Sequence, residues 1–213
     1  MKKSYVLTLL LILSFFSIAF GQTIIYAEDF TGQNGKGAFG IIPAIDITGV
    51  NWSIDISAAT LLDEEDFFLV DNETIRARDL NGSAIWLSPF IDISAFTNIQ
   101  FSLEASETGN MNPGDSFVTE YSIDGAAWTV ATTNGTITDD FIPTTVSDNG
   151  LAGNTIQLRV TMTNNGNGEN HRLDNILIEG TAPVNAAVIV NPNTINGFGY
   201  VEGENSFQEN TFT

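Results

Sequence analysis

The chain has 213 residues, of which 26 are Asp or Glu and only seven are Lys or Arg, and it contains no cysteine. Carboxylates in this excess repel nucleic-acid phosphates and anionic membranes, whose protein partners carry basic patches instead. Without cysteine, disulfides, thiol catalysis and cysteine-based zinc sites are excluded. An acidic surface suits calcium, cationic surfaces or neutral polymers such as sugars, and it also keeps exported proteins soluble.

The first 21 residues have the three parts of a secretory signal peptide. Lys2 and Lys3 form the basic start, an apolar run follows to Phe20, and Ala19 and Gly21 are the small residues that predict cleavage before Gln22. The apolar run is shorter than the ~20 residues of a membrane span, so we expect no membrane insertion. The mature protein is expected to be secreted, either extracellular or at the cell surface.

The periodicity of β-strands dominates residues 22–180. Ile99, Phe101 and Leu103 alternate with polar residues, which is typical of antiparallel strands with one buried face. We therefore predict an all-β fold, an antiparallel two-sheet jelly-roll sandwich of about nine to eleven strands. A short helical turn is allowed only at Ser57–Glu65. The expected strands are Thr23–Ala27, Val50–Ile56, Asp66–Val70, Thr74–Asp79, Ser83–Leu87, Ile99–Leu103, Phe117–Ile123, Trp128–Thr132, Ile156–Met162 and Arg172–Ile178.

Turn signals separate these strands. Asp124-Gly125 predicts a tight hairpin, and Asn81-Gly82, Asn134-Gly135 and Asn149-Gly150 predict further turns, because Asn and Gly tolerate positive φ. Residues 181–213 are predicted to be a linker and the beginning of a second β domain that is incomplete, so downstream domains of a longer chain are expected. The alternative is that this tail packs back on the sandwich.

Four short motifs resemble a module of exported multidomain proteins of the Bacteroidetes type. They are Ala27–Phe30 (AEDF), Leu87–Ser94 (LSPFIDIS), Gly114–Trp128 with its YSIDG hairpin, and Arg172–Ile176 (RLDNI). These modules are jelly rolls related in shape to MAM-type and carbohydrate-binding domains, and the resemblance covers residues 24–180. Ile189–Gly203 resembles the first strands of an Ig-like repeat, which in such arrays precedes a sorting domain or a hydrolase, often a nuclease.

The resemblance to carbohydrate-binding modules implies a structural calcium ion where the first and last strands of the jelly roll lie close together. Glu28 and Asp174 are the residues expected to meet there, and Asp115 is a weaker candidate for a further ligand. Calcium takes six to eight oxygen ligands, which carboxylates and carbonyls supply. The alternative is that these carboxylates only accept hydrogen bonds from turn N–H groups.

Sugar recognition needs exposed aromatic rings, with amide and carboxylate groups that fix the hydroxyls. Trp52 and Trp128 are the candidate aromatic residues, and Asn164 begins a polar loop that forms a candidate rim. Trp86 and Tyr121 share faces with apolar neighbours, which predicts that both belong to the core.

No residue is predicted to be catalytic. The only histidine, His171, is expected to be solvated in a loop, and no G-x-S-x-G elbow accompanies it. The sequence therefore favours a secreted, non-catalytic binding or adhesion module for a polysaccharide or cell-surface glycan. Two alternatives are an accessory N-terminal domain of a larger secreted hydrolase, such as a nuclease, and a structural spacer at the cell surface.

Overall fold

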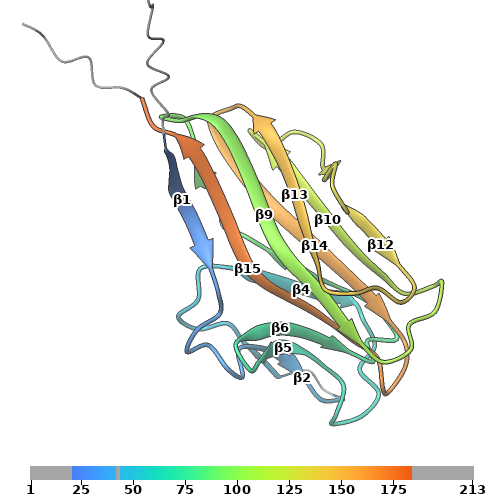
Figure 1. The fold of residues 1–213 in the computed structure, drawn as a ribbon. Coiled ribbons are helices and arrows are strands. Elements are labelled where there is room, and N and C mark those ends of the chain that lie inside the picture. The colour runs from blue at the N-terminus through green and yellow to red at the C-terminus, as the bar shows by residue number, and fades with distance from the viewer. Residues whose placement is uncertain (1–20, 42–43, 184–213) are drawn as a thin grey trace, which may run out of the picture. The chain divides into compact units, whose positions relative to one another are not determined.

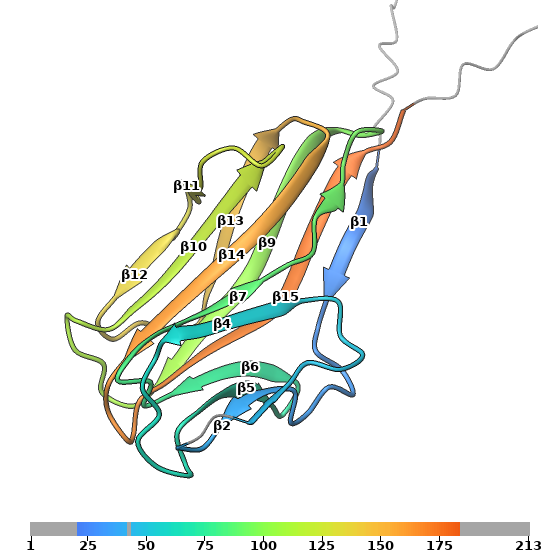
Figure 2. The same cartoon turned by 180° about the vertical axis from the view of Figure 1, so that it is seen from behind.

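The computed structural model describes residues 21–41 and 44–183. Within these ranges the chain forms fifteen β-strands and no helix, arranged as two antiparallel sheets (Figures 1 and 2). The predicted all-β jelly-roll sandwich is therefore confirmed. The signal peptide and the second β domain are predictions on residues outside the described ones. None of the described segments is a helix that could cross a bilayer.

Sheet A contains eight strands, and β15 lies near its middle. One edge of β15 pairs with β9 along almost its whole length; its other edge pairs first with β6 and then with β1 (Figure 1). The predicted closeness of the first and last strands is thus real, with Glu28 opposite Ile176. The order is β13 (Thr144–Leu151), β9 (Thr97–Thr108), β15 (Asn170–Thr181), β6 (Thr74–Arg78), β5 (Phe67–Asp71), β2 (Gly37–Phe39) and β3 (Ala44–Asp46), with β1 (Gln22–Glu28) beside β15.

Sheet B contains seven strands, seen in front of sheet A in Figure 2. Its longest pairing joins β10 and β14 in a regular antiparallel register from Ser116 opposite Thr163 to Ile123 opposite Ile156. The order is β11 (Thr129–Val130), β10 (Ser116–Ile123), β14 (Thr155–Asn164), β7 (Gly82–Leu87) and β4 (Ser53–Ala58). Two short strands complete it, β12 (Thr136–Thr138) beside β10 and β8 (Ile91–Asp92) beside β14.

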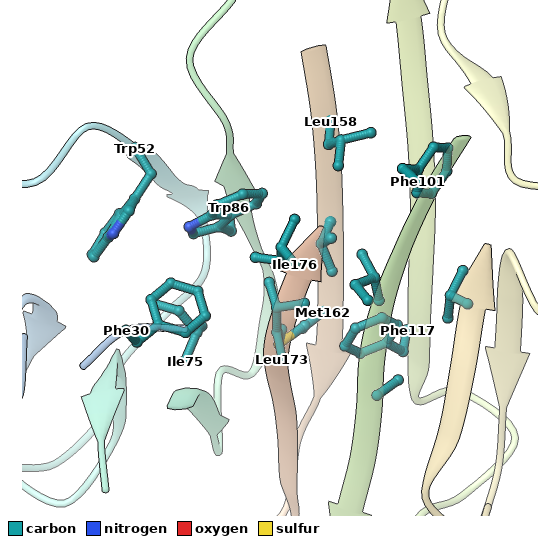
Figure 3. Packing of buried hydrophobic residues seen from close by; sticks show 14 of the residues in the cluster. Phe30, Trp52, Ile75, Trp86, Phe101, Phe117, Leu158, Met162, Leu173 and Ile176 are labelled. Carbon is teal, nitrogen blue, oxygen red and sulfur yellow. The ribbon is translucent and has the colours of Figure 1, made fainter. Parts of the chain in front are cut away.

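The core lies between the two sheets, where each long strand directs alternate apolar side chains inward (Figure 3). Phe30 joins the two sheets at one end, because its ring meets Trp52 edge-on at 6.0 Å and Trp86 edge-on at 6.2 Å. Trp86 is fully buried, so its predicted place in the core is confirmed. Tyr121 is partly buried and packs against the core through Phe101. The opposite faces of the same strands remain available to solvent.

Several predictions of local structure were wrong, for physical reasons. Asn149-Gly150 is a bulge within β13 rather than a turn, since the register with β9 shifts between Asp148 and Leu151. The helical turn allowed at Ser57–Glu65 is instead the end of β4 and a loop, because the buried Asp66 carboxylate accepts hydrogen bonds from the N–H groups of Leu62 and Asp63. The hairpin at Asp124-Gly125 is confirmed, with both residues at positive φ.

Candidate functional site

A fork in sheet A makes its outer face irregular near the middle of β15. β6 leaves β15 at Leu173 and β1 joins it at Ile176, so Asp174 and Asn175 face the gap between the two neighbours. The register with β9 also shifts here, and Asn175 has a φ of 48°. This β-bulge turns Asp174 out beside Glu104, its partner across β9.

Two adjacent hollows lie along this outer face, on β13, β9 and β15. The first, of about 230 Å³, is lined by side chains that include Gln100, Ser102, Ser147, Leu177 and Glu179. The second, of about 280 Å³, is lined by Glu104 and Asp174 among others, and the two share Thr145. We call the two hollows together the sheet A groove. Most of its lining residues are polar, and Leu177, Ala105 and Pro143 are among the apolar ones.

Strand register arranges the groove in rows that cross three strands. Thr145, Glu104 and Asp174 form one row, and Ser147, Ser102 and Leu177 form the next. Hydroxyl and carboxylate groups spaced in this way can accept and donate the hydrogen bonds that sugar hydroxyls offer. The rows therefore present hydrogen-bonding groups along an extended, open surface.

Two carboxylates of the groove, Glu104 and Asp174, lie close enough to repel each other. Burial raises the pKa of Asp174, and the negative charges of Glu104, Asp29 and Glu73 raise it further, against a hydrogen bond from the Asn175 backbone. Glu104 is held in place because its Oε2 accepts a hydrogen bond of 3.0 Å from Asn175 Nδ2. Like charges that crowd one site favour the protonated form of one of them.

The structure shows other roles for two of the predicted calcium ligands. Glu28 Oε1 accepts hydrogen bonds of 2.8 Å from the Phe30 N–H and from Gln33 Nε2, so it fastens the turn after β1. Asp115 immediately precedes β10 of sheet B and is not part of the β1–β15 pair of sheet A, and its Oδ2 accepts a hydrogen bond from the Asn112 N–H. In the described ranges no three acidic or histidine side chains are grouped so that they could hold a metal ion. Calcium binding at Glu28 and Asp174 stays a prediction. If it is correct, the protein melts at a higher temperature in millimolar calcium than in EDTA.

Two of the predicted sugar-binding residues are buried. Trp52 is 3% exposed, and its Nε1 donates a 2.7 Å hydrogen bond to Gln33 Oε1. Asn164 is fully buried; it accepts from the Leu80 N–H and donates to the Ala77 carbonyl, at 2.9 Å each. Both side chains hold the sandwich together, so neither presents itself to a ligand at the surface.

Trp128 is partly exposed, on the outer face of sheet B. The Arg159 guanidinium lies 4.3 Å from the centre of its ring, and Arg159 is paired in turn with Glu120 at 2.6 Å. This stack fixes the ring by a cation–π contact. Of the three predicted sugar-binding residues, Trp128 alone keeps an accessible side chain.

The expectation that His171 is solvated was wrong. It lies within β15, is 1% exposed and packs between Phe141, stacked at 6.0 Å, and Phe117, edge-on at 6.2 Å. Burial lowers its pKa to about 4. A neutral imidazole enclosed by aromatic rings and remote from bulk water is a core residue, so catalysis is not assigned to it.

Sequence reasoning missed the groove. The alternation of Gln100, Ser102 and Glu104 predicted that they share a polar face. Their partners across β13 and β15 depend on two bulges, and a bulge changes which side chains are neighbours without leaving a hydrophobic signal. Asp174 was singled out, but as a partner of Glu28 rather than of Glu104.

The sequence matches no family description and no curated protein. Among solved structures the chain is similar to TmCBM61 in complex with β-1,4-galactotriose (9% identity, TM-score 0.39, covering 60% of this chain and 86% of that one). It is also similar to the K2 cleaved adhesin domain of Lys-gingipain (15%, 0.40, covering 72% and 96%). A third is the CBM22-1 xylan-binding domain of Xyn10C from Paenibacillus barcinonensis (11%, 0.39, covering 78% and 99%).

Proposed function

We propose that the protein is a secreted, non-catalytic binding module that takes a polysaccharide chain into the sheet A groove. The observation that supports this is the alignment of polar side chains in rows across three strands, on an open and elongated hollow of the outer face. An extended sugar chain presents hydroxyls at regular intervals, which such rows can hydrogen-bond. The groove is shallow, so the affinity is expected to come from many weak contacts.

A steric block of the groove tests the proposal. Ser102 lies on the groove floor, and Thr161 lies on the outer face of sheet B, so Ser102→Trp and Thr161→Trp place the same bulk on opposite faces. The purified chain and both variants would be run in native gels containing galactan, xylan or mannan, where binding retards migration. We expect Ser102→Trp to weaken the affinity for the polysaccharide by at least roughly tenfold, so that the gel retards this variant less. The Thr161→Trp variant should be retarded as much as the unmodified chain.

The ring of Trp128 gives the competing location. If Trp128→Ala abolishes retardation while Ser102→Trp leaves it unchanged, the polysaccharide site lies on sheet B and the groove assignment is wrong. If no polysaccharide retards the unmodified chain, the binding function itself is rejected.

A further inference from the structure

Basic side chains are scarce in this chain, and three of them gather beside the groove. Beyond the two lysines near the N-terminus, the sequence has only Lys36 and four arginines. Arg76 and Arg78 alternate on the outer face of β6, and Arg172 lies directly opposite Arg76 on β15. Two like charges directly opposite each other on neighbouring strands destabilise a sheet. The Arg76–Arg172 pair therefore indicates a role that offsets this cost.

Arg172 differs from the other basic residues in its contacts. Lys36, Arg76, Arg78 and Arg159 each form an ion pair with a carboxylate, and Arg172 forms none with the described residues. Arg76 is already engaged by Asp71 and by Asn170 Oδ1 at 2.7 Å. The pKa of Arg76 is lowered first by burial and then by the positive charges of Arg172 and Arg78. An added negative charge at this point would relieve that repulsion.

Arg172 is also adjacent to the groove. Its partner across β9 is Ser106, which lines the second hollow, and it lies two positions before Asp174 on the same face of β15. Two strand positions correspond to roughly 7 Å. A ligand that occupies the row of Glu104 and Asp174 therefore reaches the guanidinium with its next group.

We propose that Arg172, with Arg76 beside it, binds an acidic group, a carboxylate or a sulfate, carried by a sugar in the sheet A groove. This proposal rests on the function proposed above. The planar guanidinium offers paired donors that match the two oxygens of such a group. The carboxylates of Glu104 and Asp174 line the neighbouring row and repel further anions, and the net charge of −19 disfavours a densely charged polymer. The ligand class is thus a mainly neutral polysaccharide with scattered acidic groups.

The arginine side chains can be observed directly in the unmodified protein. Its four arginines give four Nε–Hε NMR signals, which single Arg→Lys variants assign. Sodium glucuronate, glucose 6-sulfate and glucose would be titrated at constant ionic strength. We expect saturable shifts of the Arg172 signal with one or both acidic sugars and not with glucose, and no comparable shift of Arg159, which is paired on the other sheet. An Arg172 signal that moves no more than that of Arg159 with either acidic sugar would overturn the proposal.

A matched pair of polymers separates this proposal from the proposed function. Glucuronoxylan has a neutral backbone with scattered carboxylates, and carboxyl reduction removes its charge alone. We expect Arg172→Gln to weaken binding of glucuronoxylan by roughly tenfold, the size of one charge-assisted contact, and to leave binding of the reduced polymer unchanged. Equal binding of both polymers, unaffected by Arg172→Gln, overturns the acidic subsite and leaves the groove function intact. If neither polymer binds but glucuronate shifts Arg172, the subsite stands and the polysaccharide function fails.

Discussion

The buried histidine makes the stability of the sandwich depend on pH in a calculable way. His171 is enclosed by Phe117 and Phe141, and burial lowers its pKa to about 4 from the ordinary value of 6.5. In the unfolded chain the imidazole takes up a proton as the pH falls through 6.5, whereas in the folded chain it stays neutral until about pH 4. Stability is therefore fully present above pH 6.5 and is lost as the pH falls toward 4. Between pH 7 and pH 5 this difference amounts to about 2 kcal/mol in the free energy of unfolding.

Urea unfolding measured by tryptophan fluorescence at pH 7, 6 and 5 checks this value, since Trp52 and Trp86 are buried reporters. Replacement His171→Leu removes the titrating group, so the pH dependence of its unfolding free energy should be flatter by about 2 kcal/mol over the same range. The absolute stability of the variant does not enter this comparison. As the only histidine, His171 also gives an unambiguous NMR signal, which should not titrate above pH 5.

Glu107 is the charged neighbour that has to be controlled for, because it lies opposite His171 on β9 and has a buried, unpartnered Oε2. Burial and then the charge of Asp140 raise the pKa of Glu107, so its contribution to stability increases as the pH falls, opposite to that of His171. The variant Glu107→Gln removes this offset and should steepen the pH dependence. Parallel stability curves for the unmodified chain and His171→Leu, or a histidine pKa near 6.5, would refute the reasoning.

Asn164 and Trp52, which were predicted to contact a sugar and are instead buried, give two further tests. Asn164→Ala leaves the Leu80 N–H and the Ala77 carbonyl without partners, and should lower the free energy of unfolding by about 2–4 kcal/mol; Asn165→Ala, one residue on and exposed, should change it by less than about 0.5 kcal/mol. Gln33→Leu removes the acceptor of the Trp52 indole N–H and the donor to Glu28, and should cost about 1–3 kcal/mol in urea unfolding. A Gln33→Leu variant as stable as the unmodified chain would mean that the link from Glu28 to Trp52 has no structural role.

The sequence predicted the fold class and most long strands because one buried face produces a strict alternation of apolar residues, as in Ile99–Leu103. It missed β2, β3, β8 and β12, which have two or three residues each and are too short to show a period. It also missed the eight-residue β13, because Val146 and Leu151 are its only apolar residues and its Asn149-Gly150 bulge was predicted to be a turn. It also placed Trp52 and Asn164 at the surface, although tertiary partners from Gln33, Ala77 and Leu80 bury them. Side-chain burial at strand ends depends on such distant partners, which local sequence does not reveal.

The position of β15 has a consequence for how the chain is made. It is the last strand of the described residues, yet it joins the β13–β9 pair, the β6–β5–β2–β3 group and β1 into one sheet (Figure 1). Until residues 170–181 have left the ribosome, these pieces have no common neighbour, and β1 has no partner at all among the described strands. Sheet A therefore assembles only after nearly the whole of this region has been synthesised. A nascent chain without β15 therefore keeps the strand edges of β9, β6 and β1 that β15 will pair with open until this region is complete.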